Sequence, residues 1–208
     1  VWAYNDSPAS ARMAAQFGFT AARRLLHLHR HVGDIPRVDA PAGARLRAFV
    51  PRDDDAAWLA LNNRIFAGHP EQGAWTLDDL RSRLAQPWFD AGDVLMLEMH
   101  GRLAGFCWIK VEERGETGRV GEIYIIGTAP EHRGSGLGRY LLASALAHLR
   151  ERETRIAAIY VDESNGAAVS LYEANGFHHH HVDVCYTRAL PIEAQAPVDG
   201  AGRATAAA

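Results

Sequence analysis

Several features that would place this chain in a special class of protein are missing from it. No apolar run reaches the roughly 18 residues of a membrane-spanning helix. The two cysteines, Cys107 and Cys185, are too few for a disulfide framework. The net charge of −3 lacks the basic excess that draws proteins to nucleic acid. The N-terminal segment does not show the charged start, apolar middle and cleavage site of a secretory signal. We therefore expect a cytoplasmic protein with no membrane or nucleic-acid partner.

Lysine is almost absent too. Lys110 is the single lysine among 22 basic residues, and all the others are arginine. Because a primary ammonium and a guanidinium are not interchangeable, this lysine is a candidate for a specific role. The remaining composition is that of an ordinary globular protein, with 48% hydrophobic and 23% charged residues in a chain of 208. Wholesale disorder, collagen and coiled coil are excluded, and the length allows one to one and a half domains.

From residue 45 onward, the hydrophobic periodicity predicts a regular α/β order. Thr76 and Asn165 are expected to be the N-caps of two helices, and Gly176 is expected to lie just past the end of the second. His100-Gly101 is expected to form the turn of a hairpin. The predicted strands cover 45–50, 94–113 (a hairpin), 119–128, 155–163 and 181–190, and the predicted helices cover 53–68, 76–86, 134–152 and 165–177. We expect this domain to run from 45 to 190, followed by a disordered tail over 191–208.

The front of the chain predicts a strand, a helix over about Ser7 to Phe17, and a second strand. A Pro-, Gly- and Ala-rich linker over 31–44 follows it. Shifted by 158 positions, Gly18-Phe19 falls on Gly176-Phe177 and Leu26 falls on Val184. We interpret residues 1–30 as the end of a preceding, related repeat. The alternative is a chance similarity between two helix–glycine–strand units.

The sharpest motif is Arg133-Gly134-Ser135-Gly136-Leu137-Gly138, which follows a buried strand and opens a long helix. Glycines let a ligand approach the backbone, and the free N–H groups of a helix N-terminus suit a pyrophosphate. Neither the dinucleotide fingerprint nor the G-K-[ST] ending of a P-loop is present. The pattern R-x-x-G-x-G is similar to the phosphate loop of the GCN5-related N-acetyltransferases, the GNAT superfamily. The alternative is a glycine-rich turn with no ligand.

The flanking sequence resembles the same superfamily. The order of elements agrees, and the segment SNGAAVSLYEANGF resembles its second signature. The resemblance implies an α/β GNAT acetyltransferase fold with a mixed central sheet flanked by helices. In that fold two central strands, here Val120 to Thr128 and Ile156 to Val161, splay apart. The pantetheine arm of acetyl-CoA, the expected co-substrate, inserts between them.

A narrower resemblance is carried by FAGHPEQGAW, FCWIKV and GEIYIIGTAPEHRGSGLG. These segments are similar to the C-terminal, catalytic half of the mycothiol synthase family, whose members have two tandem acetyltransferase domains with an inert first domain. In the front repeat, Ala14 and Ser7 stand where Tyr172 and Asn165 stand in the second copy. The resemblance implies acetylation of the cysteinyl α-amine of a cysteinyl-glucosaminyl-inositol, a small-molecule acceptor. It also leads us to expect a monomer for the full-length protein.

The same resemblance implies a role for individual residues. Glu122 would be the base and Tyr172 the general acid, and Glu71, Lys110, Glu122 and Tyr160 would bind the acceptor. The residues implied in acetyl-CoA binding are Ile126, Gly127, Thr128, Arg133, Gly134, Ser135, Gly136, Leu137, Gly138, Arg139, Asn165, Gly166, Ala167, Ala168, Val169 and Ser170. No metal is implied.

The chemistry of amine acetylation is compatible with these assignments. A free α-amine has a pKa of about 7.7 to 8.0, so a base such as Glu122, acting through water, has modest work to do. A backbone N–H near Ile126 could hold the carbonyl oxygen as charge develops on it. Tyr172 could give a proton to the departing sulfur. No enzyme nucleophile is required, so direct transfer is expected.

Each residue also has a structural alternative. Glu122 could be a salt-bridged carboxylate, Tyr172 a core residue, Lys110 a surface charge and Glu71 a solvated loop residue. The run His178 to His181 invites a metal reading, but alternate side chains on a strand face opposite ways, so at most two of the four could share a site. Two other functions stay open: an N-acetyltransferase for a protein N-terminus or another small amine, and a module that binds acetyl-CoA without turnover.

Overall fold

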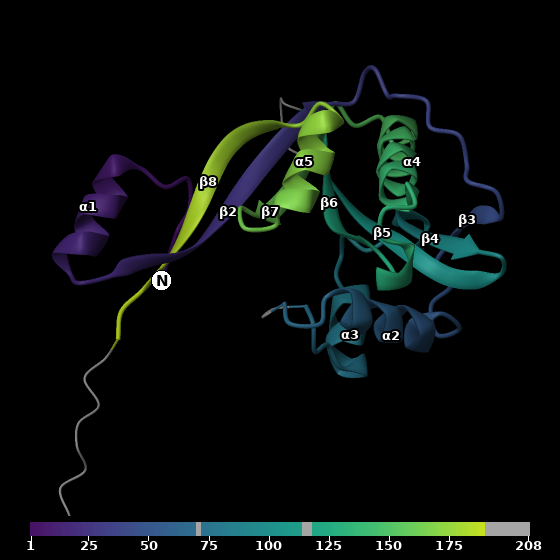
Figure 1. Ribbon diagram of the computed structural model, residues 1–208, viewed down its shortest axis with the longest axis horizontal. Helices are drawn as coiled ribbons and strands as arrows, with labels where there is room; N and C mark the ends of the chain where they lie inside the picture. Colours follow the sequence, from purple (N-terminus) through teal and green to yellow (C-terminus); the bar gives the residue numbers. More distant parts are fainter. Residues whose placement is uncertain (70–71, 114–117, 190–208) are drawn as a thin grey trace, which may run out of the picture.

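The computed structural model describes residues 1–69, 72–113 and 118–189, and its described strands form a single mixed sheet (Figure 1). The strand order is β1-β8-β2-β7-β6-β5-β4-β3, and every neighbouring pair is antiparallel except β6 and β7. The strands are β1 (Trp2–Ala3), β2 (Thr20–His31), β3 (Ala44–Ala48), β4 (Val94–Met99), β5 (Arg102–Glu113), β6 (Arg119–Thr128), β7 (Ile156–Asp162) and β8 (His178–Thr187).

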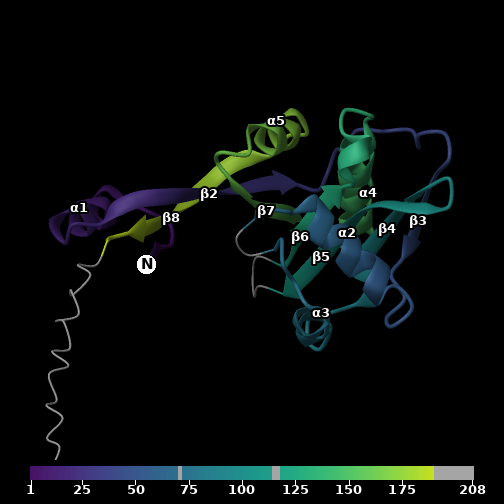
Figure 2. The ribbon, with the colours of Figure 1, turned by 60° about the horizontal axis from the view of Figure 1, so that its bottom comes forward.

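In the described part of the chain, five α-helices accompany the sheet: α1 (Pro8–Gln16), α2 (Asp55–Ile65), α3 (Leu77–Leu84), α4 (Leu137–Glu151) and α5 (Gly166–Ala174). Helices α4 and α5 lie on one side of the sheet and α2 and α3 on the other (Figures 1 and 2). Two apolar cores result. One is formed under α4 and α5 around Leu141, Ile123 and Ile159, and the other under α2 and α3 around Trp58 and Trp108.

Local sequence explains where several elements begin and turn. The side chain of Thr76 accepts a hydrogen bond from the Asp79 N–H while Asp79 reaches back to the Thr76 N–H, a capping box that starts α3. Between β4 and β5, His100 and Gly101 both have positive φ, as a two-residue hairpin turn of this hand requires. The glycine at 121 lets α4 approach the sheet, because a Cβ there would lie 2.1 Å from Leu149 Cδ2.

The second strand of the front segment, β2, lies between β7 and β8. It pairs with β7 from Leu25↔Asp162 to His31↔Ile156, and with β8 along its other edge. Leu26 and Leu28 are buried in the core under α4 and α5, so His27 between them faces the opposite side. Residues 32–43 then pass to β3 without a helix or strand.

The outer ends of β2 and β8 form an arm that carries β1 and α1 away from the body (Figure 1). None of the nine residues of α1 is buried, and Met13 and Phe17 are exposed. The strand–helix–strand order predicted for this segment is confirmed. The interpretation of the segment as the end of an earlier repeat stays a prediction, and residues 191–208 lie outside the described residues.

The two central parallel strands separate partway along their length. Pairing between β6 and β7 runs from Val120↔Ile156 to Ile123↔Ile159, although β6 continues to Thr128 and β7 to Asp162. The splay expected from the resemblance is therefore confirmed. The pairing of β5 with β6 shifts by one residue at Trp108/Ile109, so Tyr124 is an extra, bulged residue of β6. It lies at the point where β6 and β7 part.

Two smaller points concern the limits of the elements. The closing strand begins at His178 rather than at the predicted 181, so the whole histidine run belongs to β8. Among the described residues, no helix has the length and apolar character needed to cross a membrane.

Candidate active site

The glycine-rich motif forms an open loop at the start of α4. It follows a short 3-10 turn, Pro130–His132, and Gly134 and Gly136 both have positive φ, a conformation that glycine adopts without strain. Gly136 stands at the N-cap and has no side chain to occupy the first N–H groups of α4. A Cβ at either glycine would meet nothing within 4 Å. The space beside these two glycines is therefore open, and it lies at the positive end of the α4 helix dipole, where an anion could bind.

The second predicted segment, Asn165 to Ser170, forms the start of α5. The Asn165 side chain accepts a hydrogen bond from the Ala168 N–H at 3.2 Å, and residues 165–167 are exposed. A Cβ on Gly138 would lie 3.7 Å from Leu171 Cδ2, so the first turn of α4 is close to α5. The residues predicted to hold acetyl-CoA on these two helices therefore lie on neighbouring elements.

The third predicted segment, Ile126 to Thr128, is the end of β6 beyond its pairing with β7. On its other edge it remains paired with β5, through Cys107↔Ile126, Phe106↔Gly127 and Gly105↔Thr128. The edge toward β7 is open for a ligand to pair with backbone groups, since the β6–β7 ladder has already ended.

The residues predicted to bind the acceptor share one face of the sheet. Lys110 pairs with Glu122, and Glu122 pairs with Ala158 on β7. Tyr160 lies two residues after Ala158, so its side chain points to the same face. This is the face of α2 and α3, because Trp108 lies in their core and shares its parity along β5 with Lys110. The structure therefore brings three of the predicted acceptor residues together.

The single lysine is held in place by its surroundings. Lys110 Nζ lies 2.5 Å from Glu112 Oε1 and 5.4 Å from the ring centre of Trp88. Glu112 and Glu122 therefore put two carboxylates beside one ammonium on this face, so an acceptor that carries a positive charge would be attracted to it.

Tyr172 lies on the other face of the sheet, on α5. Its side chain is 6% exposed and its ring packs against Phe177. Burial, with a smaller contribution from nearby Cys107, raises the pKa of the Tyr172 phenol well above its usual value. Because Cys107 pairs with Ile126, the phenol lies near the part of β6 that has parted from β7. A protonated phenol in this place can donate a proton to a group lodged between the strands.

Glu71, the fourth predicted acceptor residue, lies outside the described residues. Its flanking loop is held by two asparagines of α2. Asn62 Nδ2 donates to the Gln72 carbonyl at 2.9 Å, and Asn63 exchanges hydrogen bonds with both backbone groups of Trp75. The sequence reasoning missed these asparagines, although an amide at Asn62, on the buried stripe with Trp58 and Leu61, was a signal.

A third residue that the sequence did not single out is His27. Its ring stacks on Tyr160 with centroids 4.1 Å apart and planes 10° from parallel. The front segment therefore contributes a side chain beside a predicted acceptor contact. No local pattern could reveal this, because His27 and Tyr160 meet only through the pairing of β2 with β7.

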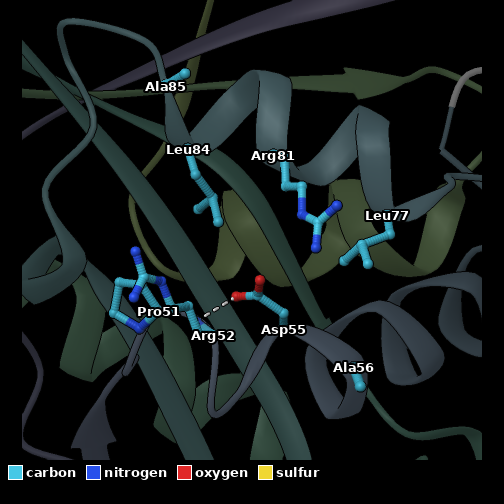
Figure 3. Close-up of a pocket in the computed structure, with 8 residues that line it drawn as sticks. All are labelled: Pro51, Arg52, Asp55, Ala56, Leu77, Arg81, Leu84 and Ala85. Atoms are coloured by element: carbon cyan, nitrogen blue, oxygen red, sulfur yellow. Dashed lines mark hydrogen bonds between the residues drawn. The ribbon is translucent and has the colours of Figure 1, made fainter.

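Two hollows on the surface of the described residues lie elsewhere. One of about 620 Å³ lies between α2 and α3, where Arg81 and Asp55 face each other and Asp55 accepts a hydrogen bond from the Arg52 N–H (Figure 3). The other, of about 690 Å³, is lined by residues that include His100 and Glu131. Among the described residues, neither lining includes a predicted site residue.

Comparison with known proteins agrees with this geometry. The sequence profile of the acetyltransferase (GNAT) family matches residues 56–177. The chain is 50% identical over 191 residues to the mycothiol acetyltransferase of Thermobispora bispora, and 49% identical over 191 residues to that of Salinispora arenicola. Each alignment covers 90% of this chain, but 65% and 62% of the respective relative. The chain thus spans less than two thirds of the length of these relatives.

Solved structures show the same fold at low sequence identity. A GCN5-related N-acetyltransferase from Sphaerobacter thermophilus superposes with a TM-score of 0.74 at 23% identity, over 89% of this chain and 57% of that one. A tandem GNAT protein from the clavulanic acid biosynthesis pathway gives 0.62 at 20% identity, over 87% and 58%. Because the family profile matches more than half of this chain, and because β6 and β7 splay apart as in that fold, this chain belongs to the GNAT family of acetyltransferases.

Proposed function

We propose that this chain transfers an acetyl group from acetyl-CoA to the cysteinyl α-amine of a cysteinyl-glucosaminyl-inositol, which forms mycothiol. Two relatives named mycothiol acetyltransferase, at 50% and 49% identity, support this acceptor. The observation that carries the proposal is the set formed by Lys110, Glu122 and Tyr160 on one face, beside the point where β6 and β7 part.

The residues around the two helix starts fit acetyl-CoA, which would supply the reactive thioester. The N–H groups at the start of α4 would hold the pyrophosphate, and the exposed side chains of Arg133 and Arg139 would add positive charge. The open edge of β6 from Ile126 to Thr128 would pair with the amides of the pantetheine arm. A backbone N–H on this edge would stabilise the developing oxyanion.

On the acceptor face, Glu122 would take the proton from the amine, through a water molecule, as the amine becomes a nucleophile. Lys110 and Tyr160 would position the acceptor. From the opposite face, Tyr172 would donate a proton to the departing sulfur, since a phenol has an ordinary pKa of about 10, burial raises it further, and the group is protonated at neutral pH. The acetyl group would pass directly from sulfur to nitrogen.

We also propose that residues 1–30 are the end of a preceding GNAT repeat. Shifted by the 158-residue offset of the repeat, Leu25 falls on Asp183, and these two residues are paired in the sheet. When two related strands pair antiparallel about a local twofold axis, equivalent positions of the two strands meet at the centre of the pairing. The exposed apolar side chains of Met13 and Phe17 also fit a helix that packs on more of such a repeat.

The test is product mass spectrometry with acetyl-CoA and a mixture of the cysteinyl-glucosaminyl-inositol, simple amines and peptides. We expect an acetyl group on the cysteinyl amine alone. Acetylation of a peptide N-terminus or another amine would contradict the proposed acceptor and favour a different N-acetyltransferase. If calorimetry detected acetyl-CoA binding but no product formed, a binding module without turnover would replace the proposal.

A further inference from the structure

Four histidines from distant parts of the chain gather on the acceptor face of the sheet. His27 and His29 come from β2, and His180 and His181 come from β8. The ring of His27 lies 4.3 Å from that of His181 and 4.5 Å from that of His29, and the rings of His29 and His180 are 4.0 Å apart. Histidines are thus concentrated at one place where two strands meet.

A bulge in β8 creates this cluster. The register between the strands shifts between His27↔His181 and Leu28↔His179, which makes His180 the extra residue. In a regular strand, His180 would face away from His181, and the alternation argument from sequence assumes such a strand. The bulge instead lets both rings point toward His27.

Three ring nitrogens converge within the cluster. His27 Nδ1 lies 3.1 Å from His181 Nδ1, and His180 Nδ1 lies 2.8 Å from the same atom. Each of these three histidines offers one ligand nitrogen, and the three nitrogens lie within 4.8 Å of one another. His181 Nδ1 has at most one lone pair in the ring plane, so it cannot accept hydrogen bonds from both neighbours. A cation among the three nitrogens would use one lone pair from each.

A buried carboxylate, that of Asp183, lies beside the His181 ring. His181 Nε2 lies 3.4 Å from Asp183 Oδ1, and Asp183, 3% exposed, also accepts a 2.7 Å hydrogen bond from the Asn5 N–H. An Nε2–H directed at Asp183 leaves the Nδ1 lone pair of His181 pointing into the cluster. Carboxylate–histidine pairs orient metal ligands in this way.

We propose that His27, His180 and His181 bind a divalent transition-metal cation of the Zn²⁺ type. Imidazole nitrogen suits Zn²⁺, Ni²⁺ and Cu²⁺, whereas Mg²⁺ and Ca²⁺ need oxygen ligands. At a Zn–N distance of about 2.1 Å, the nitrogens of tetrahedral ligands are about 3.4 Å apart. The two nitrogen–nitrogen distances of 3.1 and 2.8 Å would therefore need to lengthen by only about 0.3 to 0.6 Å. The fourth position is left for water or for the adjacent His29.

The cation would join the front segment to the last strand. His27 and His181 are 154 residues apart, so one ion would fix β2 against β8. It would also fix the ring on which Tyr160 stacks. The site does not depend on the proposed function, since metal binding is measured without any acetyl acceptor.

The test is zinc binding by the whole chain in competition with a chromophoric chelator of micromolar affinity. We expect one tightly bound equivalent, and about tenfold or greater loss of affinity in the variants H180N and H181N. The matched control is H179N, on the same strand, because His179 pairs with Glu173 away from the cluster. Co²⁺ should give the visible absorption of a four-coordinate site in the wild type and in H179N, but not in H180N.

Two results would overturn the proposal. One is a wild-type chain that takes no zinc from the chelator. The other is zinc binding of equal strength in the wild type and in H180N. Since His180 is exposed, its replacement should leave the fold intact, and circular dichroism of the metal-free variant checks this.

Discussion

Lys110 of β5 and Glu122 of β6 are direct partners across two antiparallel strands. Glu122 is at the same time the partner of Ala158 on β7, within the short stretch where the two parallel strands are still joined. The backbone at Glu122 is thus held by strands on both sides, one residue before the pairing of β6 with β7 ends. At this position the proposed base would lie next to a ligand bound in the opening between β6 and β7.

Replacement of Glu122 by Gln tests this role. The amide keeps the size of the side chain but cannot accept a proton, so we expect kcat to fall by about 100-fold or more, with little change in the KM for acetyl-CoA. Steady-state kinetics over pH 6 to 10 would measure it, with E113Q, an exposed glutamate on β5, as the control. Unchanged turnover in E122Q would remove Glu122 as the base.

The Tyr172 hydroxyl is tested with Y172F. The phenyl ring retains the packing against Phe177, so we expect a kcat loss of about 100-fold with nearly unchanged thermal stability. Y140F, on α4, serves as the control. A variant with wild-type kcat would show that Tyr172 is a core residue only.

The raised pKa of Tyr172 also predicts a pH dependence of stability. The unfolded phenol loses its proton near its ordinary pKa of about 10, while the buried phenol keeps it to a higher pH. The stabilisation is therefore complete below about pH 10 and is lost as the pH rises above it. Denaturant unfolding from pH 8 to 11 should show a smaller decline in Y172F than in the wild type. Equal declines would contradict this account.

The phosphate loop is tested with G136A. A side chain at φ +83° is strained, so we expect a loss of about 1 kcal/mol in unfolding free energy. The added methyl group would also occupy the space in front of the first N–H groups of α4, and we expect the Kd for CoA to rise about tenfold. Calorimetry of CoA binding measures this, with G33A as the control, because a Cβ at Gly33 meets nothing within 4 Å. Unchanged CoA affinity would place the pyrophosphate elsewhere.

Asp54, at the start of α2, gives a further prediction about stability. Arg47 donates to both its carboxylate oxygens, at 2.6 and 2.8 Å, and these hydrogen bonds hold the pKa of Asp54 below its usual value. A lowered pKa in the folded state gives stability that is present above about pH 4 and is lost as the pH falls through the folded pKa. D54N should cost about 2 kcal/mol at neutral pH and flatten this acid decline, whereas the exposed neighbour variant D53N should do neither. Urea titrations at pH 7 and pH 3 distinguish the two.

Much of the fold could be predicted from local patterns. The helix at 166–174 was foreseen from Asn165 and Gly176, and the hairpin from His100-Gly101, because capping and turn chemistry act within a few residues. The glycine-rich turn that opens α4 could be predicted for the same reason. Its glycines and the helix that follows them are contiguous, so the sequence alone indicates the turn and the helix start that the proposed phosphate loop needs.

The sequence by itself therefore determined the order of elements, the glycine-rich turn before α4 and, through resemblance, the family. The tertiary structure alone decided where β2 lies, that His27 stacks on Tyr160, and that His180 and His181 converge with His27. The physical reason is register. Which residues meet across a sheet depends on pairings between strands more than 150 positions apart and on a single bulge, and no local pattern records either.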